Sequence, residues 1–149
     1  PQASIGDLCF IYNKLDAALA SAMMGINGVK GVEIGDGINV ATMLGSQNND
    51  VMDKNGFKSN HCGGILGGIS NGNDIVIKSY FKPTPSIFKA QPTINLDGNE
   101  VICELRGRHD PCIGVRGSVV ATAMARLVIA DMLLLNASAN LNNLKRIYQ

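Results

Sequence analysis

The order of the structural elements is indicated first by residues 13–34, which read NKLDAALASAMMGINGVKGVEI. Apolar residues recur there every three or four positions and predict a helix over 13–26 with one apolar face. The residues on that face are Leu15, Leu19, Ala22, Met23 and Ile26. Gly28 follows closely, as glycines often do after a helix end, and residues 29–34 are typical of a strand. We therefore expect a helix that leads directly into a β-strand.

Farther along the chain, alternating apolar and polar residues predict more β-structure. Residues 74–81 alternate between two faces, as in a strand. Asp97 and Gly98, between two alternating stretches, are typical of a two-residue hairpin turn. The apolar residues of this hairpin that we expect to cover a core are Ile94, Leu96, Val101, Cys103 and Leu105.

A long apolar segment follows the hairpin. Residues 117–135 contain few polar side chains and predict a helix that is buried on most sides. Arg126 and Asp131 interrupt the segment, so we expect no membrane span. The order helix, strand, strand, hairpin, helix favours an α+β fold with antiparallel sheet. The length favours one structural unit over residues 1–149.

One segment has a different character. Residues 45–60, GSQNNDVMDKNGFKSN, are polar, rich in Asn and Ser, and without any periodicity. A stretch of this kind in a compact domain is typical of a lid, a binding loop or disorder. We therefore expect a mobile loop at 45–60.

The composition excludes several classes of protein. Hydrophobic residues make up 46% of the chain, which argues against disorder. Thirteen basic and twelve acidic residues argue against a strongly basic nucleic-acid-binding protein. The four cysteines form no CxxC pair, so we interpret them as thiols in a reducing compartment, without zinc or a disulfide framework. The start of the chain has neither a signal-peptide pattern nor an initiator Met, which predicts processing or a piece of a longer chain.

Three segments carry residues suited to ligand binding. Residues 61–72, HCGGILGGISNG, could bring backbone amides close to an anion or could form a tightly packed strand–turn–strand. Residues 82–86, KPTPS, could hold an ammonium and two hydroxyls in fixed places or could be a rigid loop. In residues 106–112, RGRHDPC, Arg108 could clamp a phosphate or carboxylate, and Asp110 could be a base or begin an Asp-Pro turn.

Four blocks in one order resemble the chorismate synthase family. They are INGVKGVEIGDG at 26–37, SNHCGGILGGISNG at 59–72, KPTPS at 82–86 and GRHDPC at 107–112. The resemblance covers nearly the whole chain but only roughly the second half of the family's sequence, so we expect a C-terminal portion of such a protein. It implies a β-α-β sandwich, of which this chain supplies about one half as antiparallel sheet packed on helices.

The resemblance also implies an activity. The family removes phosphate from 5-enolpyruvylshikimate 3-phosphate by an anti 1,4-elimination that gives chorismate, in the shikimate pathway to aromatic amino acids. It requires FMN in the reduced form, and NADP is also associated with it. The family is a cytoplasmic homotetramer, and we expect no nucleic-acid or membrane partner. Because the acid–base histidines of the family lie in the other half, we expect this chain alone to be inactive. The alternative is a non-catalytic oligomerisation or flavin-binding scaffold.

The resemblance further assigns roles to residues of this chain. Asp110 is similar to a carboxylate that could shuttle a proton near the flavin, and it is the catalytic candidate. The residues that resemble flavin contacts are Asn27, Gly28, Gly67, Lys82, Pro83, Thr84, Pro85, Ser86 and Arg108. At Gly28 we expect the backbone to make the contact. No metal ligand is implied.

Overall fold

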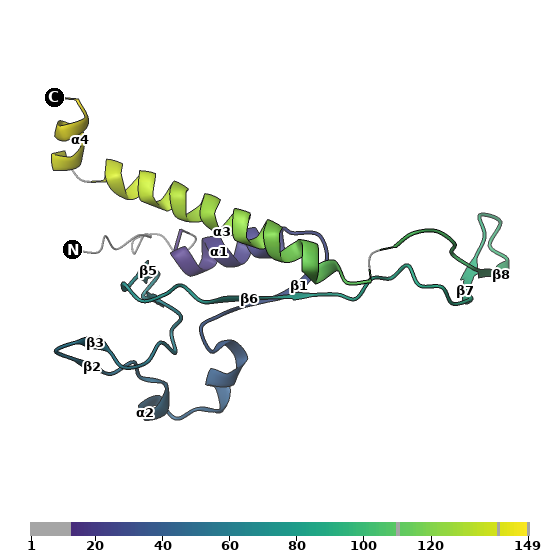
Figure 1. Cartoon of the computed structure of the whole chain (residues 1–149), viewed down its shortest axis with the longest axis horizontal. Helices are drawn as coiled ribbons and strands as arrows, with labels where there is room; N and C mark the ends of the chain where they lie inside the picture. The colour runs from purple at the N-terminus through teal and green to yellow at the C-terminus, as the bar shows by residue number, and fades with distance from the viewer. Residues whose placement is uncertain (1–12, 110, 140, 149) are drawn as a thin grey trace.

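The computed structural model describes residues 13–109, 111–139 and 141–148. Its body has two layers, a pair of helices lying along an antiparallel pair of strands (Figure 1). The elements of the body are α1 (Leu15–Met24), β1 (Val29–Ile34), β6 (Ile77–Phe81) and α3 (Ile113–Ser138), with α4 (Leu141–Ile147) after α3. Helices and antiparallel strands in this order confirm the predicted α+β fold class.

The strands β1 and β6 form the ladder at the centre of the body. Ile34 lies opposite Ile77, and Val29 lies opposite Phe81. The register shifts between Val29 and Gly31, as at a β-bulge. Because the pairing is antiparallel, the start of β1 lies beside the end of β6. Two segments that are far apart in the sequence therefore meet at one end of the ladder.

The core lies between α1, the strands and α3. Its buried hydrophobic residues are Leu15, Leu19, Met23, Val29, Ile65 and Met132. The first three belong to the apolar face predicted for the first helix and confirm it. Ala22 is half-buried, and Ile26 lies beyond the end of the helix, which is shorter than the predicted 13–26. Burial of each such side chain contributes roughly 1.5–3 kcal/mol to stability, so α1 is fastened to the body mainly by this face.

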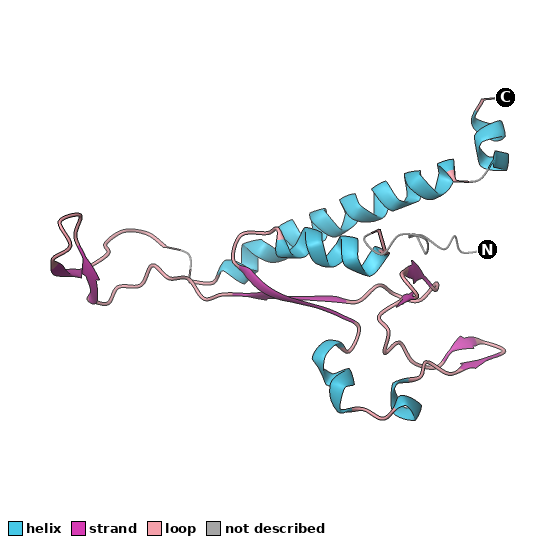
Figure 2. Cartoon of the chain, turned by 180° about the vertical axis from the view of Figure 1, so that it is seen from behind, coloured by secondary structure: helices cyan, strands magenta, loops and turns pink. Residues whose placement is uncertain are grey.

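Residues 37–72 form a chain of short elements beside the body (Figures 1 and 2). They are η1 (Gly37–Thr42), α2 (Gly45–Asn48), β2 (Met52–Asp53), β3 (Gly56–Phe57), β4 (Ile65–Leu66) and β5 (Ile69–Ser70). The segment 45–60 thus contains a short helix and a small hairpin, while its mobility stays a prediction. Two-residue turns join β2 to β3 and β4 to β5. In the second turn Gly67 and Gly68 have φ of 62° and 90°, which favours glycine.

An arm leaves the body after β6 and returns at the start of α3 (Figure 1). At its far end β7 (Gln91–Ile94) pairs with β8 (Glu100–Cys103), which confirms the predicted hairpin. The predicted two-residue turn is wrong, because Ile94 pairs with Glu100 and the loop spans 95–99. The Asn95 side-chain oxygen accepts hydrogen bonds from the backbone N–H of Asp97 (3.0 Å) and Asn99 (2.9 Å). These side-chain bonds close a wider loop in place of a tight turn.

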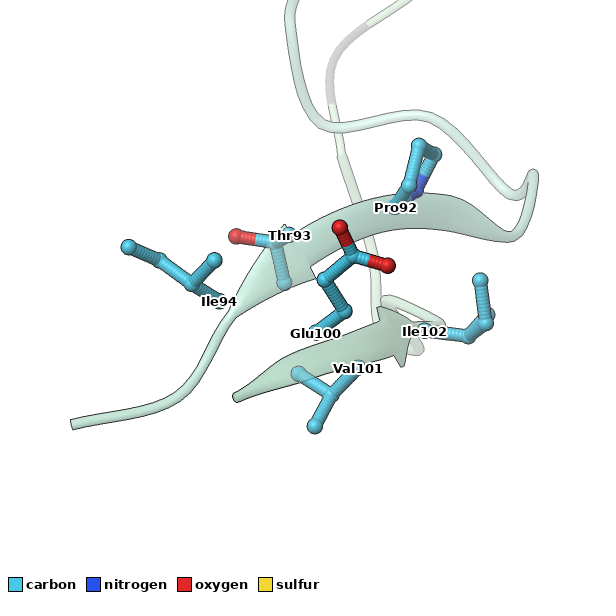
Figure 3. Close-up of a pocket in the computed structure, with 6 residues that line it drawn as sticks. All are labelled: Pro92, Thr93, Ile94, Glu100, Val101 and Ile102. Carbon is cyan, nitrogen blue, oxygen red and sulfur yellow. The ribbon is translucent and has the colours of Figure 1, made fainter. Parts of the chain in front are cut away.

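The prediction that this hairpin covers a core is also wrong for this chain. Ile94 is 68% exposed and Leu96 fully exposed, because the hairpin stands away from the body (Figures 1 and 2). The hairpin has a hollow of about 570 Å³ on its surface. Figure 3 shows the side chains that line it. The residues that line it are Pro92, Thr93, Ile94, Glu100, Val101 and Ile102. Its one charged side chain is a carboxylate, which makes it unfavourable for an anion.

Helix α3 differs from its prediction in extent and in burial. It begins at Ile113, earlier than the predicted 117, and ends at Ser138. The prediction of burial on most sides is wrong, because Gly117 and Met132 are the buried residues of its described part. The strongly exposed apolar side chains include Val115 (72%), Val119 (70%), Leu127 (65%) and Leu134 (71%). The helix packs on α1 and β6 along one side, and its other side faces away from the body.

Candidate functional site

Two of the predicted binding segments meet at the end of the β1–β6 ladder. The backbone N–H of Lys82 donates a hydrogen bond of 2.8 Å to the carbonyl of Gly28. The φ of Gly28 is 91°, a conformation that favours glycine. A Cβ at this position would lie 3.6 Å from Cγ2 of Ile113, so the start of α3 is also close. The structure thus brings the Asn27–Gly28 and Lys82 segments together beside the first turn of α3.

A cavity of about 560 Å³ opens beside this junction. Its walls are mostly apolar and come from the end of α1, the end of β6 and the first turns of α3. The apolar residues among them include Ala22, Ile26, Phe81, Ile113, Val120 and Met124. Asn27 and Arg116 add an amide and a guanidinium to this lining. The volume is within the range of roughly 300–1,000 Å³ for small-molecule sites, and the lining fits a planar ring system with an anionic group.

The KPTPS segment leads from this junction into the arm. Lys82 has its backbone in the junction, and its side chain is exposed. Pro83 and Pro85 are exposed, whereas Thr84 and Ser86 are half-buried. The prolines fix the backbone of this extended stretch. The predicted flavin contacts of Lys82 to Ser86 therefore lie in one continuous segment that begins at the cavity.

The returning side of the arm carries the remaining candidates. Arg108 is exposed there. The rings of Phe88 and His109 lie 5.8 Å apart between centroids, inclined by 51°. This contact ties the two sides of the arm together just before α3. Asp110, the catalytic candidate, lies outside the described residues.

Gly67 lies elsewhere. The carbonyl of its neighbour Gly68 accepts a hydrogen bond of 2.8 Å from the backbone N–H of Leu15, at the start of α1. Gly28 follows the end of the same helix, and a helix of 10 residues is about 15 Å long. The structure therefore does not bring Gly67 together with Gly28 and Lys82 within this chain. It presents Gly67 as the exposed tip of the β4–β5 hairpin.

A polar cluster that the sequence did not predict lies at the base of this hairpin. One oxygen of the Asp50 carboxylate accepts hydrogen bonds from the Ser59 hydroxyl (2.7 Å) and the backbone N–H of His61 (2.8 Å). The other oxygen accepts from the backbone N–H of Cys62 (3.0 Å). Asp50 stands in the aperiodic segment 45–60, where no pattern marks one polar residue among many. Only the folded chain shows which carboxylate accepts hydrogen bonds from residues 59–62.

A second carboxylate completes the cluster. Nδ1 of His61 and Oδ2 of Asp36 lie 2.6 Å apart, and the backbone N–H of Asp36 donates to the carbonyl of His61 at 3.0 Å. These two contacts join the turn after β1 to the start of the glycine-rich segment. Both side chains are about one third exposed, with 29% and 33% of their surfaces accessible.

The electrostatics of the cluster follow from these contacts. Burial raises the pKa of the Asp50 carboxyl, but hydrogen bonds from the Cys62 thiol, the Ser59 hydroxyl and two backbone N–H groups hold it well below its usual range. Burial and the Asp50 carboxylate both raise the pKa of the Cys62 thiol. The thiol therefore stays protonated, which does not suit a nucleophile. The Asp50 carboxyl is therefore ionised at neutral pH and accepts the hydrogen bonds that hold the backbone of His61 and Cys62 in place.

Two further features bear on the class of protein. Helix α3 has the length and composition that a membrane span requires, with 26 residues and a mean hydropathy of 1.9 in its most apolar window. A core helix of a water-soluble protein can meet the same criteria, and α3 contains the charged residues Arg126 and Asp131.

Among the residues that the structure describes, no group of three or more His, Cys, Asp or Glu side chains could hold a metal ion.

Comparisons with known proteins agree with one another. The family model described as chorismate synthase matches residues 1–134. The chain is 75% identical over 146 residues to the chorismate synthase of Campylobacter fetus subsp. fetus, covering 98% of this chain and 40% of that protein. It is 66% identical over 138 residues to the chorismate synthase of Campylobacter jejuni subsp. jejuni, covering 93% of this chain and 38% of that one.

A solved structure shows the same likeness. A crystal structure of chorismate synthase superposes with a TM-score of 0.69 at 32% identity, over 88% of this chain and 33% of that chain. This chain therefore spans about 40% of the length of the curated relatives it matches. The fold and the sequence matches together establish that the chain belongs to the chorismate synthase family.

Proposed function

We propose that this chain forms part of an FMN-dependent chorismate synthase, a lyase of the shikimate pathway. The reaction is the anti 1,4-elimination of phosphate from 5-enolpyruvylshikimate 3-phosphate to give chorismate. The observation that carries the proposal is the 2.8 Å hydrogen bond from Lys82 to Gly28, which joins two segments expected to contact flavin beside a cavity of about 560 Å³. Family membership supports the reaction class, and the cavity supports a cofactor within this part of the chain.

The residues of this chain would divide the work of binding FMN. Asn27 lines the cavity. With the backbone of Gly28 and the stretch Lys82 to Ser86, which follow the lining residues Asn27 and Phe81 in the chain, it would hold the ring system. The exposed Arg108 would pair with an anionic group of cofactor or substrate through a two-pronged hydrogen bond. Reduced FMN, when bound, supplies transient electron density for the elimination. Asp110, two residues after Arg108 in the sequence, would hold or release a proton near the ring.

The activity belongs to a longer polypeptide than this one. The chain covers 40% of the Campylobacter fetus protein, and the acid–base residues expected for the family have no counterpart in it. We expect this chain by itself to form no chorismate from 5-enolpyruvylshikimate 3-phosphate and reduced FMN. A chimera of the Campylobacter fetus chorismate synthase, with this chain in place of the matching region, should be active. Chorismate formation by the chain alone, or an inactive but folded chimera, contradicts the proposal.

A second candidate function is an oligomerisation module. The exposed apolar side of α3 favours it, because a helix face with Val115, Val119 and Leu134 open to water is costly for a monomer. Size-exclusion chromatography tests this: we expect the chain to self-associate, and the full enzyme to be a homo-oligomer, a tetramer as in the family. A clean monomer contradicts self-association.

Titration with FMN separates the two candidates. Flavin binding by the chain supports a residual cofactor site, whereas self-association without flavin binding supports a scaffold.

We further propose a cytoplasmic protein without a membrane or nucleic-acid partner, in which α3 packs within the protein rather than in a bilayer. The near-neutral charge, formally +1, supports the absence of a nucleic-acid partner.

A further inference from the structure

The Asp50 carboxylate holds the base of the glycine-rich hairpin that presents Gly67, beside the contact between His61 and Asp36. Asp50 accepts hydrogen bonds from the Ser59 hydroxyl and from the backbone N–H groups of His61 and Cys62. The two backbone donors lie directly before Gly63, where the hairpin segment begins. Both carboxylate oxygens are therefore occupied by the chain that leads into the hairpin.

Further hydrogen bonds hold the backbone between the Asp50 contacts and the tip of the β4–β5 hairpin. The Asn60 side-chain oxygen accepts a hydrogen bond of 2.7 Å from the backbone N–H of Gly64, and the carbonyl of Gly64 accepts one of 3.0 Å from Asn71. On the other side, the carbonyl of Gly68 accepts from Leu15 at 2.8 Å. The tip residue Gly67 is exposed between these fixed points. Its backbone is held, but its surface is open to a ligand.

We propose that Asp50 is a positioning residue for flavin binding: its carboxylate fixes the backbone of His61 and Cys62, and thereby the β4–β5 hairpin that offers Gly67 to FMN. This inference rests on the proposed function, because it takes the ligand of Gly67 to be FMN. Asp50 does not touch the cofactor. It acts through the backbone, and a carboxylate is required because it alone accepts on both oxygens.

The substitution Asp50→Asn tests this requirement with little change in shape. The amide of Asn has one acceptor oxygen, and its NH₂ group would face an N–H donor of Ser59–Cys62. At least one backbone donor would lose its partner. The matched control is Asp53→Asn, which removes the same charge nearby. The Asp53 carboxylate bonds Asn55 and Lys58 within the β2–β3 hairpin and makes no recorded bond to residues 59–72.

The measurement uses the chimeric full-length chorismate synthase described above. FMN affinity is measured by equilibrium titration, and backbone mobility of residues 61–72 by amide hydrogen exchange. We expect Asp50→Asn to weaken FMN binding about ten-fold, the change that corresponds to one lost hydrogen bond to a charged group. Exchange in 61–72 should become faster, while Asp53→Asn changes neither quantity.

The outcomes separate this inference from the function on which it rests. If the unsubstituted chimera binds no FMN, the proposed function fails, and this inference fails with it. If the unsubstituted chimera binds FMN and Asp50→Asn binds it as tightly as Asp53→Asn, the inference alone is overturned, even when the melting temperature falls. Weaker binding by the Asp50 variant at an unchanged melting temperature is the supporting result.

Discussion

The body and the arm of this molecule are built from similar residues but are stabilised very differently. In the body, Leu15 and Leu19 are completely buried between helices and strands. In the arm, Ile94 and Ile102 are 68% and 65% exposed on a two-stranded hairpin. A hairpin without a packing surface is marginal in water. The comparison teaches that an apolar pattern identifies the side chains that a segment could bury. Whether those side chains are buried depends on the presence of a second surface on which they can pack.

The largest expected effect is a loss of unfolding free energy from a substitution in the body, compared with a small loss from one in the arm. Leu19→Ala removes a completely buried side chain from α1 and should cost about 2–5 kcal/mol of unfolding free energy. Ile102→Ala in the arm, where the side chain is mostly exposed, should stay within about 0.5 kcal/mol. Urea unfolding followed by circular dichroism measures both. Equal losses for the two variants would mean that the arm is packed in solution.

The second prediction concerns the contact between α3 and the end of β6. A Cβ at Gly117 would lie 2.4 Å from the Phe81 ring, so Gly117→Ala forces the ring or the helix to move. We expect a loss of about 1–3 kcal/mol. Gly114→Ala, in the same helix, meets only Sγ of Cys112 at 3.6 Å and should be stabilising by up to about 1 kcal/mol. Thermal melts of the pair test this, and stabilisation by both variants would contradict the close contact.

A third prediction addresses the arm alone. Asn95→Ala removes the oxygen that accepts from Asp97 and Asn99, and should destabilise the hairpin loop by about 1 kcal/mol. Because the arm stands away from the body, amide exchange should become faster in residues 91–103 and stay unchanged in β1 and β6. Faster exchange in the ladder as well would show that arm and body unfold together.

The smallest expected effect is a change in the pKa of Tyr80, which lies in the body. The Tyr80 hydroxyl donates a hydrogen bond of 2.8 Å to Oε2 of Glu33, and this bond raises the pKa of Tyr80 above its ordinary value of 10. A raised folded pKa means that the stabilisation is present below pH 10 and is lost as the pH rises through the folded pKa. Ultraviolet titration at the tyrosinate band should show a lower pKa in Glu33→Gln. An unchanged Tyr80 titration in that variant would rule out the bond in solution.

Sequence reasoning predicted the elements better than their surroundings. The apolar face of α1, the strands β1 and β6 and the existence of the arm hairpin follow from local periodicity, which is a property of a few neighbouring residues. The burial of α3 and of the hairpin could not be predicted in this way, because burial depends on surfaces contributed by distant chain. The hairpin loop was missed because the side chain of Asn95, rather than Asp97–Gly98, organises it.

The candidate site shows the same division. Its motifs identified the family and the residues to inspect, and family membership is confirmed by the relatives and the solved structure. The roles of those residues stay predictions. No motif indicated that Lys82 would bond Gly28 or that Asp50 would fasten the glycine-rich hairpin, because each contact joins segments with no common pattern.

By itself, the sequence determined the main helices and strands of the body, the presence of the arm hairpin, and to which family the chain belongs, since these depend on residue identity and spacing. Tertiary structure alone decided which apolar faces are buried, which glycine turn is tight and which carboxylate is held by backbone donors. The physical reason is that burial and hydrogen bonding are properties of pairs of surfaces. The antiparallel pairing of β1 with β6 creates such a pair by bringing residue 28 beside residue 82.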